Sequence, residues 1–228
     1  MLEQVAFDIE TTGFDVDDEV TVVGFALPLG VRVFVQTGGQ TADDIEARVK
    51  AQLSGTLVNI STHPDEPELL AAVSKFVAER IQNADVLLIA YNGEVWSGGF
   101  DLPFLRTRYA HHEVAWPFVD IPYADVMPLV TDRFNTTVDG AEEGGLVTAY
   151  EVLCDGSDGE IDPFADSAEA VTAFNDGQFT DLVLHNVADV LRTQALGAIA
   201  ERYCSKADFS VKSLSPTREA LVWLSERV

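Results

Sequence analysis

Cysteine and long apolar runs are scarce in this sequence, and each shortage excludes a class of protein. Two cysteines, Cys154 and Cys204, are too few for a disulfide framework, and no Cys-x-x-Cys spacing of the zinc-binding kind occurs. The longest apolar run, residues 86–90, is far too short to cross a bilayer. The first residues include acids and lack the basic and apolar pattern of a signal peptide. We therefore expect a cytoplasmic protein without membrane association, whose cysteines remain reduced thiols.

Positive charge is also scarce. Lysine and arginine together number 14 against 38 acids, which gives a net charge of −24, and only four of the bases are lysine. At ordinary salt such a protein repels nucleic acid. At about 1 M ionic strength the screening length is only roughly 3 Å, so the net charge hardly reaches a partner. The composition is typical of a cytosolic protein from an extreme halophile, with an acidic protein from ordinary salt as the alternative. The charge argues against a nuclease without excluding one.

Apolar residues are plentiful, and their spacing predicts an α/β fold. They make up 47% of the chain, an ordinary value for a globular protein with one sizeable core. Alternating and apolar runs predict strands at residues 2–10, 20–27, 31–35 and 85–90, the last of them buried on both faces. Helical spacing predicts helices at residues 67–81, 101–109 and 180–203.

The order of these elements predicts the architecture. Three strands joined by short turns indicate an antiparallel meander, and the helix–strand–helix units after it indicate a mixed sheet flanked by helices. No internal repeat or linker interrupts the pattern, so we expect one domain over residues 1–228. Residues 139–166 are rich in glycine and acids, and we expect them to form a surface loop excursion.

The first candidate site is the acidic pair Asp8 and Glu10, at the end of the first strand. Residues two apart on a strand share a face, so the two carboxylates point into the same space. Such a pair is favourable when a hard cation such as Mg²⁺ or Mn²⁺ lies between its members. In a chain with 38 acids among 228 residues, an acid-x-acid pair occurs about six times by chance. The apolar strand before the pair and Thr11-Thr12-Gly13 after it are what single it out, because sites in α/β sheets lie at such strand ends.

The second candidate site follows the buried strand at residues 85–90. Asn92-Gly93 and Gly98-Gly99 allow close approach of a ligand to the backbone, and Asp101 begins the next helix. An acid at this place also stabilises a helix simply as a cap, which is the structural alternative.

The third candidate site is on the long helix near the carboxyl terminus. His185 and Asp189 are four residues apart and share a face, next to the apolar stripe of Leu184, Val187 and Leu191. The pair is therefore expected at the edge of the core, where a site can form. The alternative is a histidine–aspartate pair that faces solvent.

Taken together, the three segments resemble the DEDD superfamily of 3′–5′ exonucleases. The matching strings are Phe7-Asp8-Ile9-Glu10-Thr11-Thr12-Gly13, then Tyr91-Asn92-Gly93 with Phe100-Asp101-Leu102-Pro103-Phe104-Leu105, and finally His185 with Asp189. They occur in the family's order and span residues 8–189, most of the chain. The resemblance implies an RNase H-like fold with a mixed five-stranded sheet. It also implies that Asp8, Glu10, Asp101 and Asp189 bind two metal ions, Mg²⁺ or Mn²⁺, with His185 as the group that takes the proton from the attacking water.

Two features depart from the family's pattern. One branch of the family has a tyrosine four residues before its last aspartate, and another has a histidine five residues before it, whereas His185 stands four before Asp189. One residue is about 100° around a helix, so the direction of this ring decides its role. The second departure is an insertion, Glu94-Val95-Trp96-Ser97, between Asn92 and Asp101.

Several further residues are candidates for contact with a nucleic acid. Trp96 is a possible platform for stacking a base, although such a ring more often packs on its own loop. Some of the scarce bases are candidates for phosphate contact, namely Arg106, Arg108, Arg192, Arg202, Lys206 and Lys212. For Arg106 and Arg108 the alternative is ion pairing to the many acids. The full set of expected substrate-binding residues is Thr11, Thr12, Asn92, Trp96 and Arg106.

The sequence thus favours a two-metal 3′–5′ exonuclease that acts on the ends of single-stranded DNA or RNA. The first alternative is a nucleic-acid-binding module with the same fold and little or no activity. The second is a plain halophilic domain whose acids only hold hydration water. DNA or RNA preference, oligomeric state and protein partners are left open by the sequence.

Overall fold

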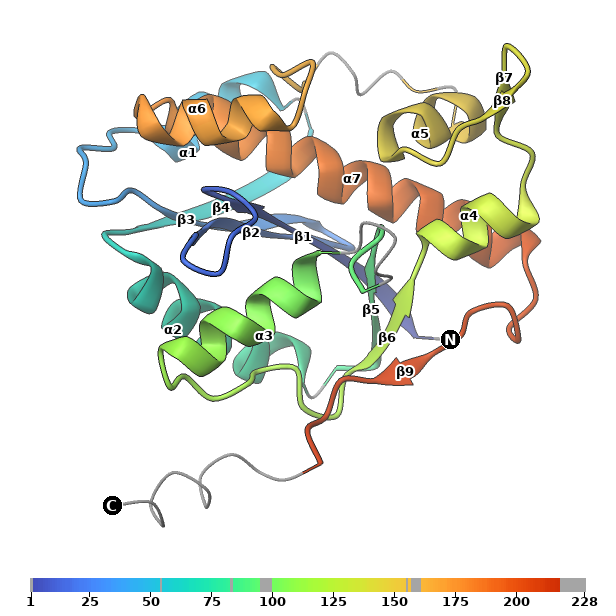
Figure 1. Ribbon diagram of the computed structural model, residues 1–228, viewed down its shortest axis with the longest axis horizontal. Helices are drawn as coiled ribbons and strands as arrows, with labels where there is room; N and C mark the ends of the chain where they lie inside the picture. The colour runs from blue at the N-terminus through green and yellow to red at the C-terminus, as the bar shows by residue number, and fades with distance from the viewer. Residues whose placement is uncertain are drawn as a thin grey trace.

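A mixed β-sheet lies at the centre of the molecule (Figure 1). The computed structural model describes residues 2–53, 55–82, 84–94, 100–154, 156 and 161–217. In spatial order, the strands of the central sheet are β4 (Leu57–His63), β3 (Gly30–Gln36), β2 (Val20–Leu27), β1 (Glu3–Thr11), β5 (Val86–Ala90), β6 (Pro122–Asp125) and β9 (Lys212–Ser213). The meander β1–β2–β3 is antiparallel, and β9 is antiparallel to β6. The pairs β1–β5, β5–β6 and β3–β4 are parallel.

The predicted α/β fold, with a mixed sheet flanked by helices, is confirmed and is compatible with an RNase H-like arrangement. The central sheet has seven strands where five were expected. The two outermost strands account for the difference. Strand β4 is largely exposed and β9 is only two residues long, so neither carries a strong apolar pattern.

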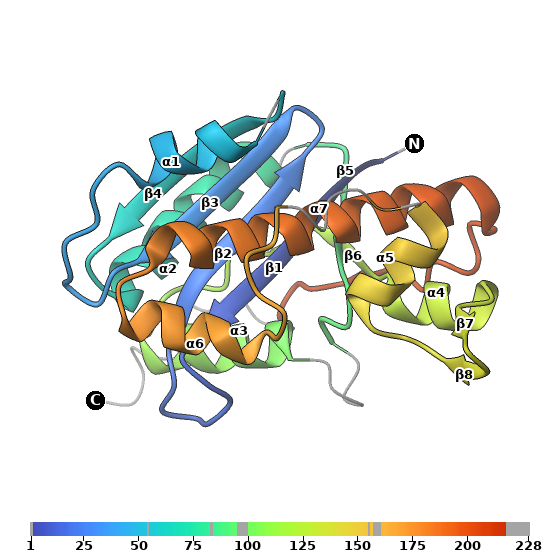
Figure 2. The same ribbon diagram turned by 90° about the horizontal axis from the view of Figure 1, so that it is seen from above.

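Helices cover both faces of the sheet (Figures 1 and 2). The long helix α7 (Phe179–Tyr203) crosses one face, together with α1 (Ile45–Gln52), α5 (Leu146–Cys154) and α6 (Ala168–Asn175). The opposite face is covered by α2 (Glu66–Phe76), which continues into the π-helical turn η1 (Val77–Ile81), and by α3 (Asp101–His111). Helix α4 (Met127–Arg133) follows β6. Within the described part of the chain, no helix combines the length and the apolar character needed to span a membrane.

The alternation of β1 sets the direction of its side chains. Val5, Phe7 and Ile9 pack in the core under α2 and α3, while Ala6 packs in the core under α7. Because successive side chains point to opposite faces, Asp8 lies on the α7 side with Ala6. The whole of β5 is buried, as its apolar run predicted.

The acidic region at residues 139–166 is more structured than the expected loop excursion. It contains β8 (Ala141–Glu142), which pairs with β7 (Thr137–Val138) in a small hairpin, and the helix α5. Leu146, Ala149, Tyr150 and Leu153 have helical spacing and pack in the core with α7. Residue 155 and residues 157–160 lie outside the described part of the chain.

Candidate metal centre

Asp8 and Glu10 lie near the end of β1, on the face that α7 covers. In the pairing with β2, Asp8 is opposite Gly24 and Glu10 is opposite Val22, and the register shifts just after Glu10. The side-chain amide of Asn186, on α7, donates a hydrogen bond of 2.9 Å to Asp8 Oδ2. Glu10 is only 8% exposed, whereas Asp8 is half-buried. The two acids are therefore fixed on a rigid strand, with one of them in reach of solvent.

Helix α7 brings His185 and Asp189 to the same place. His185 Nε2 is 4.0 Å from Glu10 Oε1 and 3.9 Å from Asp189 Oδ2. One ligand atom from each of these three residues lies within 4.8 Å of the others, a spacing at which one metal ion can contact all three. His185 is 4% exposed, so the alternative of a solvent-facing histidine–aspartate pair is wrong. Despite its spacing of four from Asp189, the ring faces the carboxylates.

Asp101 reaches the cluster from the other side of the sheet's edge. It is the first residue of α3 and is 9% exposed, and the residue at the capping position is Phe100 instead. Asp101 is near enough to Asp8 and to Glu10 for the carboxylates to raise one another's pKa. The acid therefore faces the other carboxylates and does not fill the position of a helix cap.

The electrostatics of the four acids are unfavourable as long as all are charged. Burial raises the pKa of Glu10 to about 8, Asp189 adds to the rise, and His185 opposes it. Burial and the neighbouring carboxylates, Asp101 first, hold the pKa of Asp8 well above its usual range. The pKa values of Asp101 and Asp189 are also raised, in both cases mainly by burial. Such a cluster binds protons or a cation to relieve the repulsion.

The donor set fits a hard divalent cation. Four carboxylates converge, and oxygen ligands of this kind suit Mg²⁺ or Mn²⁺. Asp189 keeps 16% of its side chain exposed, so that an ion or a substrate can approach from this side and from Asp8. Asp8, Glu10, Asp101 and Asp189 are the residues that would hold the ions.

Asp162, which the sequence did not identify, and Arg192 of α7 hold the side chains of His185 and Asp189 in place. The carboxylate of Asp162 accepts a hydrogen bond of 2.8 Å from His185 Nδ1. Arg192 Nη1 lies 2.6 Å from Asp162 Oδ2 and 2.6 Å from Asp189 Oδ1. Because Arg192 occupies Oδ1 of Asp189, the second oxygen of that carboxylate is the one directed toward His185. The expectation that Arg192 contacts phosphate is wrong, since the side chain is buried between two acids.

The contacts of His185 favour its charged form. Although burial opposes it, the hydrogen bond to Asp162 and the charges of Glu10 and Asp189 raise the pKa of His185 to about 9. The same contacts, together with Arg192, lower the pKa of Asp162 despite its burial.

A fifth acid, Asp125, holds the loop that leads to Asp101. It ends β6, and its carboxylate accepts hydrogen bonds from the backbone N–H groups of Asn92, Glu94 and Met127, at 2.8, 3.2 and 3.1 Å. Asn92 adopts a φ of 61°, which an asparagine tolerates in a tight turn. The carboxylate of Asp125 is therefore occupied by three backbone N–H groups, which makes its role structural. No local pattern in the sequence indicated this role.

The expected substrate-binding residues have different positions. The hydroxyl of Thr11 donates to the carbonyl of Gly13, and that of Thr12 bonds Asp18, so both hold the turn between β1 and β2. Trp96 lies outside the described residues. Arg106 forms an ion pair of 3.0 Å with Glu94, which is the alternative considered from the sequence.

An exposed aromatic ring, that of Phe14, packs against the residue that precedes α3 and was missed in the sequence. Phe14, in the turn after β1, is 84% exposed, and its ring centre is 5.1 Å from that of Phe100. Phe100 in turn lies 4.7 Å from Phe104, one turn into α3. Phe100 directly precedes Asp101, so this aromatic surface adjoins the candidate metal centre. In the sequence, the only sign of an exposed ring was the position of Phe14 directly before the acidic turn at residues 15–19.

Arg108 also differs from expectation. It was a candidate for phosphate contact, but its guanidinium is buried and forms an ion pair with Glu66 of α2, at 2.6 Å.

The geometry of the centre stands without support from relatives: comparison of the sequence with models of known protein families gives no match, and comparison with curated proteins gives none either.

Proposed function

We propose that the protein is a metal-dependent 3′–5′ exonuclease that acts on single-stranded ends of DNA or RNA. One observation carries the proposal: ligand atoms of Glu10, His185 and Asp189 lie within 4.8 Å of one another at the end of β1. Asp8 and Asp101 are near enough for these carboxylates to raise their pKa values. When bound there, two divalent ions would lower the pKa of the attacking water and stabilise the leaving oxygen. The compartment in which this occurs, in our proposal, is a reducing cytoplasm of high salt.

His185 is the proton acceptor in this proposal. Its Nε2 points toward Glu10 and Asp189, while its Nδ1 is bound to Asp162. The pKa of the ring is raised in part by these acids. Neutralisation of Glu10 and Asp189 by cations removes that contribution, so the ring becomes a base at a lower pH. A neutral imidazole can then take a proton from water.

Two further features support a nucleic acid as the substrate. A pocket of about 200 Å³ opens beside His185 and Asp189, lined by the start of α5 and by residues from 162–167. On the other side lie the rings of Phe14 and Phe100, of which Phe14 is almost fully exposed. Exposed aromatic rings stack on bases of any sequence, which suits an enzyme that removes successive nucleotides.

The direct test is an assay for release of nucleotides. Single-stranded DNA and RNA, labelled at the 5′ end, are incubated with the protein and Mg²⁺ or Mn²⁺ at about 1 M KCl, where screening removes the repulsion from the acidic surface. We expect a ladder that shortens from the 3′ end, and none with Asp8→Asn. The matched control is Asp132→Asn, an exposed acid on α4. Equal, negligible turnover by all three proteins would contradict the proposed enzyme, and binding without turnover would favour the inactive module.

A further inference from the structure

Asp162 joins two residues of α7 from outside the helix. The chain returns after α5, and the carboxylate of Asp162 accepts from His185 Nδ1 at 2.8 Å and from Arg192 Nη1 at 2.6 Å. Its side chain is only 5% exposed, and Oδ1 also accepts the backbone N–H of Phe164. His185 and Arg192 are seven residues, or about two helical turns, apart, so one carboxylate fixes both side chains.

The ring of His185 is held in one orientation by these contacts. The ring of Phe164 lies beside it, with centres 5.2 Å apart. A neutral imidazole has one N–H, and a carboxylate at Nδ1 requires the proton to be there. The lone pair is then on Nε2, which faces Glu10 and Asp189 at 4.0 and 3.9 Å.

We infer that Asp162 is a positioning residue of the proposed exonuclease, which fixes the tautomer and the direction of His185. The inference rests on the proposed function. In the hydrolytic step, the proton of the attacking water moves to His185 Nε2 while the water oxygen forms a bond to phosphorus. The bond from phosphorus to the 3′-oxygen of the preceding nucleotide breaks, and that oxygen takes a proton from solvent. Asp162 takes no proton, and its negative charge stabilises the imidazolium that forms.

The contacts of Asp162 make one substitution especially informative. In Asp162→Asn the side chain has one acceptor oxygen and one donor NH₂ in place of two acceptors. Arg192 is a permanent cation with donors only, so the amide oxygen turns toward it. The NH₂ then faces His185 Nδ1, which must become the acceptor, and the ring proton moves to Nε2. The substitution keeps the shape of the side chain while it reverses the tautomer.

The experiment compares wild type, Asp162→Asn, Asp162→Ala and the control Asp132→Asn on a single-stranded oligonucleotide with Mg²⁺. We expect kcat to fall about 100-fold or more in Asp162→Asn and about 10- to 100-fold in Asp162→Ala, with KM changed less than about twofold. The control should retain the wild-type kcat, since Asp132 is exposed. Stabilisation by Mg²⁺ in a thermal melt should be the same in all four proteins. Loss of that stabilisation in Asp162→Asn would place Asp162 among the determinants of metal binding and overturn the inference.

Nitrogen NMR of the histidine rings separates this inference from the proposed function. The protein has four histidines, so the signals of His185 are assigned by their absence in His185→Gln. Metal-free protein is measured at a pH above the pKa of the ring. We expect the proton on Nδ1 in wild type and on Nε2 in Asp162→Asn. An unchanged tautomer together with wild-type kcat would overturn the inference, whereas an inactive wild type with the expected signals would contradict only the nuclease.

Discussion

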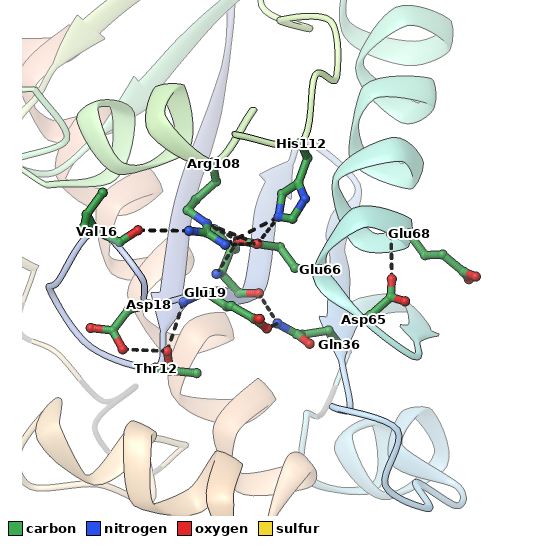
Figure 3. A network of polar contacts seen from close by, with 11 residues as sticks. Thr12, Val16, Asp18, Glu19, Gln36, Asp65, Glu66, Glu68, Arg108 and His112 are labelled. Carbon is green, nitrogen blue, oxygen red and sulfur yellow. Dashed lines mark hydrogen bonds and ion pairs between the residues drawn. The ribbon is translucent and has the colours of Figure 1, made fainter. Parts of the chain in front are cut away.

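Two clusters of buried acids lie at different places in the molecule and deal with negative charge in different ways. Between α2 and α3, Glu66 is 1% exposed and is surrounded by donors (Figure 3). Arg108 donates to both of its oxygens, and His112 and the backbone N–H of Val20 complete the set. Arg108 also donates to the carbonyl of Val16, which fixes the turn between β1 and β2 (Figure 3).

The cluster at the end of β1 has more acids than side-chain cations. Asp8, Glu10, Asp101 and Asp189 converge there. Among the residues that the structure describes, the positive groups in contact with them are His185 and Arg192, which also share Asp162. Arg108 thus balances the charge of Glu66, whereas His185 and Arg192 do not balance the four acids of the second cluster. A buried acid says little by itself, and the balance of charge around it distinguishes a structural ion pair from a candidate metal centre.

The largest effect that this comparison predicts is on catalysis. Asp8→Asn removes a charge that the proposed metal ions need, and we expect kcat/KM to fall about 10⁴-fold, or roughly 5 kcal/mol. Glu66→Gln leaves the carboxylates at β1 in place, so soluble protein of that variant should lose far less activity per folded molecule. The measurement is nucleotide release at saturating Mg²⁺. Comparable losses in both variants would mean that the two clusters are not functionally distinct.

A second prediction concerns stability. Arg108→Met leaves Glu66 buried without its main cation, and we expect the free energy of unfolding to fall by about 3–5 kcal/mol. Arg106→Met, two residues away, removes an ion pair with Glu94 and a contact with the ring of Trp116, both made by a half-exposed side chain, and should cost about 0–1 kcal/mol. Urea denaturation measures both. Equal losses in the free energy of unfolding would show that the buried ion pair stabilises the protein no more than the exposed one.

The pH dependence of the stability of metal-free protein is a third prediction. The pKa of Glu10 is raised to about 8 and that of His185 to about 9, so the folded protein holds protons that the unfolded chain has released. Stability should therefore fall as pH rises from about 5 to 9, by up to about 1.4 kcal/mol per pH unit for each proton held. Mg²⁺ competes with these protons, so its stabilising effect should grow over the same range. Thermal melts with and without Mg²⁺ test this. The control is Glu10→Gln, in which the slope should become smaller because one of the held protons is gone.

The smallest expected effect links the two clusters. The turn fixed by Arg108 carries Phe14, whose exposed ring adjoins the candidate centre through Phe100. Loss of one base-stacking contact in Phe14→Ala should raise KM about 5- to 30-fold, which corresponds to about 1–2 kcal/mol, with kcat nearly unchanged. The matched control is Leu29→Ala, an exposed apolar residue in the turn between β2 and β3. A fall in kcat without a change in KM would show that Phe14 affects the chemistry and not the binding.

Sequence patterns predicted the parts of the fold and site that depend on local spacing. Strand β2 and helix α7 appeared at nearly their predicted bounds, and the alternation of β1 placed Asp8 and Glu10 on one face. Strand β4 was missed because only one of its seven residues is buried, so no apolar alternation marks it. Helix α5 was hidden in an acidic, glycine-rich region whose composition resembles a loop.

Pairings between distant residues were beyond the reach of local patterns. Arg108 and Glu66 are 42 residues apart, and Asp162 is 23 residues from His185. In a chain with 38 acids, nothing marks Asp162 or Glu66 as different from the others. Their roles follow from which acid the fold buries beside which base, and this is decided by packing.

The position opposite Asp8 on the neighbouring strand has no side chain at all. A methyl group on Gly24 would lie 1.9 Å from Asn186 Oδ1, and Asn186 donates to Asp8 through its amide nitrogen. Alanine at position 24 would therefore displace Asn186 and leave Asp8 without this donor. The missing side chain at position 24 thus lets Asn186 of α7 lie against β2, within reach of Asp8 on the next strand. Any redesign of the carboxylates for another ion must keep that space for Asn186.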